Sequence, residues 1–139
     1  MSTLEKAIAI ASKAHEGQVD KGGNPYILHP LRVMLRLDTD EERIVAVFHD
    51  LFEDTAVTSA DLGEQGFSAE IIDAVHALTK KNGEAYLDFI ARAKKNRIAR
   101  KVKAADIEDN MDLTRIPDPT EEDEERVKKY RAALEALTL

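Results

Sequence analysis

The stretch from Glu41 to Glu53 carries apolar side chains on nearly every side of a helix. Its large apolar residues are Ile44, Val45, Val47, Phe48 and Leu51. A helix that is apolar all round has to be buried, because no face of it is suited to water. We therefore expect a central helix over 41–53, with the rest of the chain packed around it.

The remaining segments also have helical spacing. Apolar residues recur at intervals of three and four, and no segment alternates apolar and polar residues for long enough to indicate a strand. Pro30 fits the first turn of a helix, and Ser68 and Thr120 are suited to cap helix starts. The segments expected to be helical are 4–15, 29–37, 69–78, 86–93, 98–113 and 120–137, with a short piece after Thr58. The predicted fold class is all-α, in one domain.

Composition excludes several classes of function. The chain has 139 residues, enough for one domain with a real core, and it has no Cys. Disulfides, thiolate zinc sites and thiol nucleophiles are therefore excluded. No apolar run is long enough to span a membrane, and no signal-peptide centre precedes the first helix, so we expect a cytoplasmic protein. The net charge of −7 makes nucleic acid an unlikely partner.

The charge is unevenly distributed. Residues 80–103 contain nine Lys or Arg and two acids, whereas residues 104–139 contain eleven acids and five bases. Solvated helix faces explain this pattern. Two alternatives are a basic surface that attracts a phosphorylated small molecule, and a nucleic-acid site whose affinity would fall steeply with salt.

Two imidazoles and two carboxylates stand out as candidate metal ligands: His29, His49, Asp50 and Asp106. Such a set suits a divalent ion such as Mn²⁺, Fe²⁺ or Zn²⁺. Glu53 and Asp54 follow Asp50 at helical spacing, so the three acids are expected on one side of the helix. Carboxylates at the end of so apolar a helix would be costly to bury without a cation. The pattern predicts a metal-dependent hydrolase in which Glu53 and Asp54 act on water.

Four motifs then carry a resemblance to a known family. They are His15-Glu16-Gly17-Gln18, the run from Lys21 to Pro30, the run from His49 to Asp54, and the run from Val102 to Asn110. In this order they resemble the HD-domain superfamily, and within it the hydrolase domain of the RelA/SpoT alarmone enzymes and the single-domain small alarmone hydrolases. The likeness extends over roughly residues 4–116, and the chain is too short to hold the synthetase domain of the long family members as well.

The resemblance implies a single HD-type helical bundle over residues 1–139, acting as a metal-dependent phosphohydrolase with bound Mn²⁺. Its reaction would remove pyrophosphate from the 3′ position of the guanosine alarmones ppGpp or pppGpp. His29, His49, Asp50 and Asp106 match the family's metal ligands, and Glu53 and Asp54 match the acids that position or activate water. Lys21 and Asn110 match positions near the substrate's phosphates and ribose.

The chain departs from the family at Asp20, where an Arg is usual, and at Asp112 and Leu113. An acid at position 20 would not stack on guanine and would repel phosphate. Two alternatives therefore stay open. One is an HD-type phosphohydrolase acting on another phosphorylated nucleotide or cofactor, and the other is a catalytically silent metal-binding interaction module. The sequence indicates no oligomeric state.

Several residues have simpler interpretations. His76 is expected at the surface, whereas His15 either packs in the core or supports the metal ligands from behind. Lys103 is expected to point to water, with contact to the substrate as the alternative, and Tyr26 and Phe48 are expected in the core. Asp106 and Asn110, with Glu108, Asp109 and Asp112, would on their own be explained by a wet acidic helix face.

Overall fold

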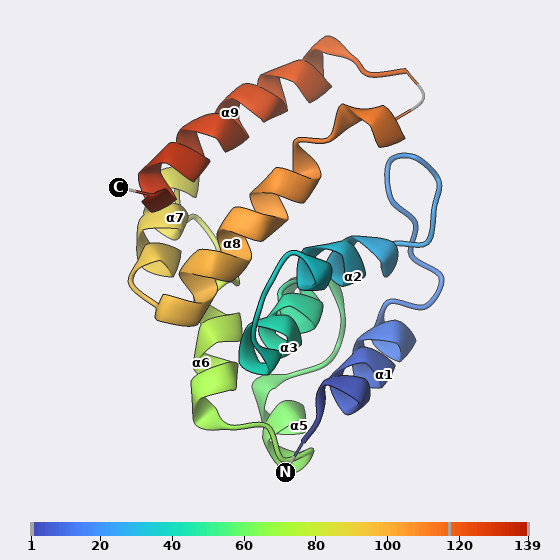
Figure 1. Cartoon of the computed structure of the whole chain (residues 1–139), viewed down its shortest axis with the longest axis vertical. Coiled ribbons are helices and arrows are strands. Elements are labelled where there is room, and N and C mark those ends of the chain that lie inside the picture. The colour runs from blue at the N-terminus through green and yellow to red at the C-terminus, as the bar shows by residue number, and fades with distance from the viewer. Residues whose placement is uncertain (1, 117, 139) are drawn as a thin grey trace.

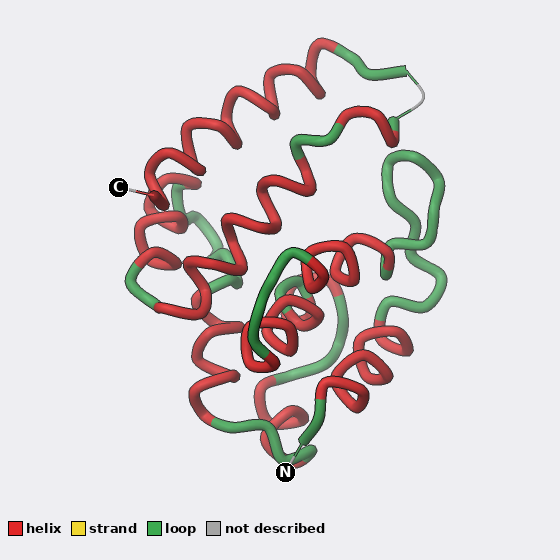
Figure 2. The backbone as a smooth tube through the Cα atoms, in the orientation of Figure 1, coloured by secondary structure: helices red, strands yellow, loops and turns green. Residues whose placement is uncertain are grey.

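The structure, a computed structural model, describes residues 2–116 and 118–138. Helices joined by loops make up this part of the chain, and no strand is found in it beyond one isolated bridge between Val19 and Pro25 (Figure 2). The elements are α1 (Leu4–Ala14), α2 (Leu28–Leu35), α3 (Asp40–Phe48), α4 (Leu51–Asp54), α5 (Ser59–Glu64), α6 (Ala69–Ala77), α7 (Tyr86–Lys94), α8 (Arg97–Asn110), the 3-10 turn η1 (Leu113–Arg115) and α9 (Glu121–Thr138). The predicted all-α fold class is confirmed.

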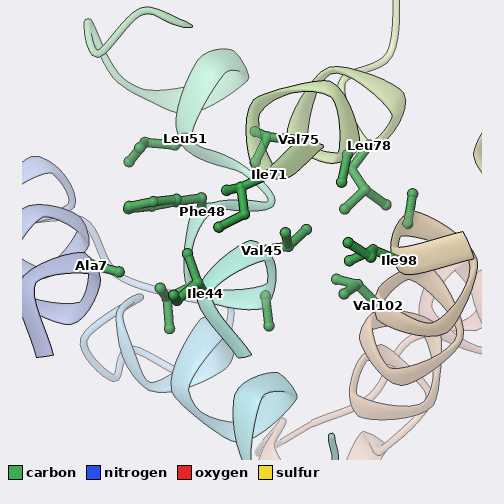
Figure 3. Packing of buried hydrophobic residues seen from close by; sticks show 14 of the residues in the cluster. Ala7, Ile44, Val45, Phe48, Leu51, Ile71, Val75, Leu78, Ile98 and Val102 are labelled. Carbon is green, nitrogen blue, oxygen red and sulfur yellow. The ribbon is translucent and has the colours of Figure 1, made fainter. Parts of the chain in front are cut away.

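Helix α3 lies at the centre, as its apolar sequence predicts (Figure 1). It begins at a capping box, in which the Thr39 hydroxyl accepts from the Glu42 backbone N–H and the Glu42 carboxylate accepts from that of Thr39. Its apolar face meets α1, α6 and α8 in the main core, where Phe48 and Val45 lie among Ile71, Val75 and Val102 (Figure 3). The core therefore fixes the positions of the helices that carry the candidate ligands.

The expected single helix over 41–53 is wrong, because the chain breaks at His49-Asp50. Helix α3 ends at Phe48 and the short α4 begins at Leu51. At the break, the Ala46 carbonyl accepts from both the backbone N–H and the Nδ1 of His49, the latter at 2.6 Å. A side chain that occupies a carbonyl of the helical ladder interrupts the helix. The break turns His49 and Asp50 away from the path of a regular helix.

A smaller apolar cluster joins the C-terminal helices. Ile90 of α7, Ile107 of α8, and Ala133 and Leu137 of α9 are buried against one another. Helices α8 and α9 lie side by side in Figure 1. This cluster attaches α9 along one side of α8, so that the N-terminal turns of α9 reach the loop that precedes α2.

The helix expected over 98–113 ends earlier, at Asn110. Asp112 then caps the turn η1, because its Oδ1 accepts from the backbone N–H of Thr114 at 3.0 Å. Pro117, expected just beyond this helix, lies outside the described residues. The start of α9 agrees with the prediction, since the Asp123 N–H donates to the Thr120 hydroxyl at 3.2 Å and the Thr120 N–H to Asp123 Oδ2 at 2.8 Å.

The loop between α1 and α2 projects toward the start of α9 (Figure 1). Gly17 and Gly23 turn it with φ of 87° and 84°, values that favour glycine. Lys21, near its tip, forms an ion pair of 3.3 Å with Asp123 of α9. Over the described residues, no helix is both long and apolar enough to cross a membrane.

Candidate functional site

The four predicted ligand residues lie together. His29 comes from the first turn of α2, His49 and Asp50 from the break after α3, and one donor atom from each lies within 4.8 Å of the other two. Asp106 of α8 joins them, with its Oδ1 2.9 Å from His29 Nε2 and 3.3 Å from His49 Nε2. The residues form a possible His/Asp metal site.

The outer hydrogen bonds of both rings decide which nitrogen faces the cluster. His49 Nδ1 donates to the Ala46 carbonyl, and His29 Nδ1 lies 2.6 Å from Asp109 Oδ2. In a neutral ring with its hydrogen on Nδ1, the Nε2 atom carries a free lone pair. His49 Nε2 is buried without a hydrogen bond, yet it lies 3.1 Å from Asp50 Oδ2. A lone pair that faces a carboxylate is repelled unless a proton or a metal ion lies between them, and the two imidazoles and two carboxylates are donors that suit a divalent metal.

The charges of the cluster are strongly coupled. Burial, with the charges of Asp106, Asp54 and Glu53, raises the pKa of Asp50 well above its ordinary value. At Asp106, burial also acts to raise the pKa. Lys103 and the two histidines outweigh it and hold the pKa of that carboxyl well below its usual range. Burial also disfavours charge on His29, yet its bonds to Asp106 and Asp109 raise the pKa of the ring to about 9.

The two oxygens of Asp106 face different partners. Oδ1 is directed toward the histidines and accepts from Asn110 Nδ2 at 3.1 Å, whereas Oδ2 accepts from Lys103 Nζ at 2.9 Å. The Lys103 side chain is only 13% exposed, and its Nζ lies 4.9 Å from the centre of the Phe89 ring. The expectation that Lys103 points to water is therefore wrong: it is a buried cation beside a candidate ligand.

A pocket of about 430 Å³ opens over this cluster. Both predicted substrate residues, Lys21 and Asn110, line it. Helix α9 contributes Asp123, Arg126 and Tyr130, which the sequence did not indicate. Asp123 accepts hydrogen bonds from both Lys21 and Arg126, so one buried carboxylate holds two pocket cations.

Glu53 and Asp54 do not line this pocket, and both are exposed. Glu53 Oε1 accepts from the backbone N–H of Lys80 at 2.5 Å, and the Asp54 carbonyl accepts from Gln18 Nε2 at 3.0 Å. Asp50 is the N-cap of α4 rather than an internal helical residue, and the Asp54 N–H still donates to the Asp50 carbonyl at 3.0 Å, as in a helix. Both acids still lie close enough for their charge to raise the pKa of Asp50.

Two further residues reach the candidate ligands. Asp109 is 1% exposed rather than on a wet face, and its carboxylate contacts His29 and Arg32. Its position three residues after Asp106 places it on the same side of α8, which is the signal that the sequence contained. Tyr26, expected in the core, is half-buried and donates its hydroxyl hydrogen to Asp50 Oδ2. Phe48, by contrast, is fully buried as expected.

The remaining histidines divide as expected. His15 is 2% exposed, bonds through Nδ1 to Gln18 Oε1 at 2.8 Å, and lies 5.0 Å from the Tyr26 ring between centroids. It thus packs directly behind a residue that contacts Asp50. His76 is exposed, with its ring against Phe52.

The positions that depart from the family pattern have local structural roles. Asp20 Oδ1 accepts from the Asn24 backbone N–H at 2.9 Å and so closes the loop before α2. Asp112 caps η1. Both residues, with Leu113, also line the pocket. The rim of the pocket is therefore more acidic than the resemblance led us to expect.

The basic segment 80–103 is divided among several environments. Arg92 is tied to Glu84 at 3.0 Å and to the carbonyls of His76 and Thr79, and Lys103 belongs to the candidate site. Five other bases line a second hollow of about 690 Å³: Lys94, Lys95, Arg97, Arg100 and Lys101. Attraction of a phosphorylated molecule to this segment stays a prediction.

Comparison with known proteins finds relatives of this chain, although no family model matches it. Aligned over 99% of its length, the chain is 30% identical to a probable GTP pyrophosphokinase of Mycobacterium leprae, of which it covers 18%. It is 46% identical over 77 residues to a guanosine-3′,5′-bis(diphosphate) 3′-pyrophosphohydrolase of Haemophilus influenzae, covering 51% of this chain and 11% of the relative. This chain is similar to enzymes of the RelA/SpoT type.

A solved structure agrees with this similarity. A metazoan ortholog of SpoT, described as hydrolysing ppGpp, matches the present chain with a TM-score of 0.77 and 22% sequence identity. The match covers 99% of the present chain and 84% of the metazoan protein's chain. At this identity the likeness establishes the fold. The chain spans less than a fifth of the length of the curated relatives it matches.

Proposed function

We propose that this RelA/SpoT-type domain is a Mn²⁺-dependent hydrolase that removes pyrophosphate from the 3′ position of ppGpp or pppGpp. In that reaction a water oxygen bonds to the phosphorus nearest the ribose, and the bond from this phosphorus to the 3′ oxygen breaks. The 3′ oxygen takes a proton, and pyrophosphate leaves. The observation that carries the proposal is the His29–His49–Asp50–Asp106 cluster, of which His29, Asp50 and Asp106 line a pocket that lysine and arginine side chains also line.

We assign His29, His49, Asp50 and Asp106 as the metal ligands. Two imidazole nitrogens and two carboxylate oxygens suit Mn²⁺, with Fe²⁺ and Zn²⁺ as alternatives. A bound divalent ion supplies positive charge at the phosphoryl oxygens and makes water nucleophilic at neutral pH. Tyr26 supports this assignment, because its hydroxyl restrains one oxygen of Asp50.

The proton of the attacking water would pass to Glu53. Its Oε1 accepts from the Lys80 N–H, and its side chain is exposed. Asp54 would orient the same water. These two roles come from the family resemblance, and the charge that both acids impose on Asp50 is consistent with them.

The pocket cations would bind the phosphates. Lys21 and Arg126 both pair with Asp123, and a phosphate group entering between them would replace that carboxylate as their partner. Asn110, whose amide is oriented by Asp106 Oδ1, would bond to the ribose or to a phosphate oxygen. Positioning and positive charge are what phosphoryl transfer requires of a protein.

A second candidate, a different phosphorylated nucleotide or cofactor, is favoured by one observation. Asp20 and Asp112 add carboxylates to the rim of the pocket. Each would repel a phosphate group brought within a few ångströms. A substrate with fewer phosphate groups near Asp20 and Asp112 would avoid this repulsion and could be hydrolysed by the same metal chemistry.

The experiment is to measure pyrophosphate and GDP release from ppGpp by the Mn²⁺-loaded protein, with GTP, dGTP and NADPH as competing candidates. A His49→Ala variant is the control for contaminating activity. Pyrophosphate release from ppGpp that the variant lacks would support the alarmone assignment. Turnover of another substrate alone would replace it with the second candidate. No turnover by a protein that binds Mn²⁺ would favour a silent metal-binding module.

A further inference from the structure

Asp109 is a buried carboxylate with two kinds of partner. It lies on α8, three residues after Asp106, and its side chain is 1% exposed. Its Oδ2 lies 2.6 Å from His29 Nδ1, and its Oδ1 lies 3.0 Å from Arg32 Nε and 3.9 Å from Arg36 Nη2. His29 and Arg32 both belong to α2, so Asp109 joins α8 to α2 immediately behind the candidate metal site.

These contacts fix how His29 is presented. A carboxylate accepts but does not donate, so the bond to Asp109 requires a hydrogen on Nδ1. The ring then turns Nε2 toward Asp106 Oδ1, 2.9 Å away, on the side where the other ligands lie. Arg32 also lies 3.2 Å from Asp109 Oδ2, which holds the carboxylate in one orientation. Such pairing offsets the cost of burying its charge.

We infer that Asp109 is a positioning residue of the metal site: it sets the tautomer and the orientation of His29, and Arg32 holds Asp109 in place. This inference rests on the proposed function, because it takes His29 to be a metal ligand. A carboxylate that accepts from the outer nitrogen of a ligating histidine strengthens the ring as a donor. Asp109 itself does not touch the metal or the substrate.

The neighbouring acid on the same turn provides a matched control. Glu108 is also on α8, is half exposed, and pairs with Arg36 at 3.4 Å. Glu108→Gln removes one negative charge close to the site without touching His29. Exposed ion pairs of this kind contribute little to stability. A difference between variants at positions 108 and 109 therefore reports the buried contacts of Asp109 with His29 and the arginines rather than the loss of charge alone, and the His29 resonance identifies the part that comes from His29.

The test compares Asp109→Asn, Asp109→Ala and Glu108→Gln in the full chain. Metal affinity is measured for Mn²⁺ by competition with a chelator, without substrate. The hydrogen on His29 Nδ1 is followed by NMR in the Zn²⁺-loaded protein, where a strong bond to a carboxylate moves its resonance downfield. We expect Asp109→Ala to lose the downfield resonance and to bind metal about 10–100-fold more weakly. Asp109→Asn should fall between, because its amide oxygen still accepts, and Glu108→Gln should match the parent.

Two results would overturn the inference. One is parental metal affinity and a parental His29 resonance in Asp109→Asn, which is nearly isosteric and keeps the test valid if Asp109→Ala does not fold. The other is an equal loss of affinity in Glu108→Gln, which would assign the effect to charge. A parent that binds metal but turns over no nucleotide would contradict the proposed function alone. A parent that binds no metal would overturn the metal site and this inference with it.

Discussion

The two ends of the pocket are built differently. At the inner end, the side chains of His29, His49 and Asp106 are at most 7% exposed and are held by hydrogen bonds between α2, the α3–α4 break and α8. At the outer end, Lys21 is 57% exposed and reaches Asp123, 102 positions further along the chain, through one ion pair. Buried networks are rigid, whereas exposed ion pairs contribute little and rearrange easily. The contrast suggests that the inner end fixes the metal chemistry and that the outer end chooses the substrate.

The largest effect is expected from breaking the inner end. Asp106→Ala removes the carboxylate that faces both histidines and leaves Lys103 buried without its partner. We expect metal content after dialysis to fall to background, and nucleotide hydrolysis with it. Asp88→Ala, which changes an exposed acid on α7, should keep both. Full metal content in the folded Asp106→Ala variant would show that the assigned ligand set is wrong.

Glu53 does not line the pocket, and a change there tests whether metal binding can be separated from catalysis. Glu53→Gln keeps an oxygen for the Lys80 N–H but cannot take a proton from water. Loss of a general base typically lowers kcat by about 10²–10⁴-fold, so we expect that decrease with unchanged Mn²⁺ affinity. Steady-state kinetics measure the expected decrease in kcat, and a metal titration of the same preparation measures the Mn²⁺ affinity. Unchanged kcat would remove Glu53 from the mechanism.

The inner end was also the more predictable one. The all-α class and the buried α3 followed from apolar spacing, and the grouping of His29, His49, Asp50 and Asp106 followed from residue types together with the family resemblance. The break at His49-Asp50 was missed because it depends on a side chain that binds the carbonyl of Ala46, which helical periodicity does not reveal. The burial of Asp109 and Lys103 was missed because polar residues on a charged helix read as solvated until their partners on other elements are known.

The outer end could not be predicted for a different reason. Asp123 and Arg126 occupy charged positions that suggest a solvated helix face, and Tyr130 is expected on the inner side of the same helix, so none of the three indicated a pocket. Their place in the pocket depends on how α9 packs on α8 through Ile107 and Leu137. Contacts between residues so far apart in the chain are decided by tertiary packing, and local patterns do not contain that information.

A smaller effect is expected from the outer end. Lys21→Gln removes a pocket cation without touching the metal cluster. Loss of one partly exposed phosphate contact costs about 1 kcal/mol, so we expect KM to rise about fivefold, with unchanged metal affinity. The rise should shrink at high salt, because exposed charges are screened. Lys13→Gln, an exposed lysine on α1, is the control. A loss of metal affinity in Lys21→Gln would contradict the division into two ends.

The smallest effects should come from two matched helix caps. Thr39 caps the central α3, and Thr120 caps α9 at the outer end of the pocket through its bonds with Asp123. Loss of a threonine cap costs about 1 kcal/mol. In Thr39→Ala we expect that loss in the free energy of unfolding by urea, with KM unchanged, because α3 belongs to the main core. In Thr120→Ala, Asp123 loses a bond that orients it toward Lys21 and Arg126, so KM should change while metal affinity does not. If Thr39→Ala shifts KM as much as Thr120→Ala does, the rim is coupled to the core and the two ends do not act separately.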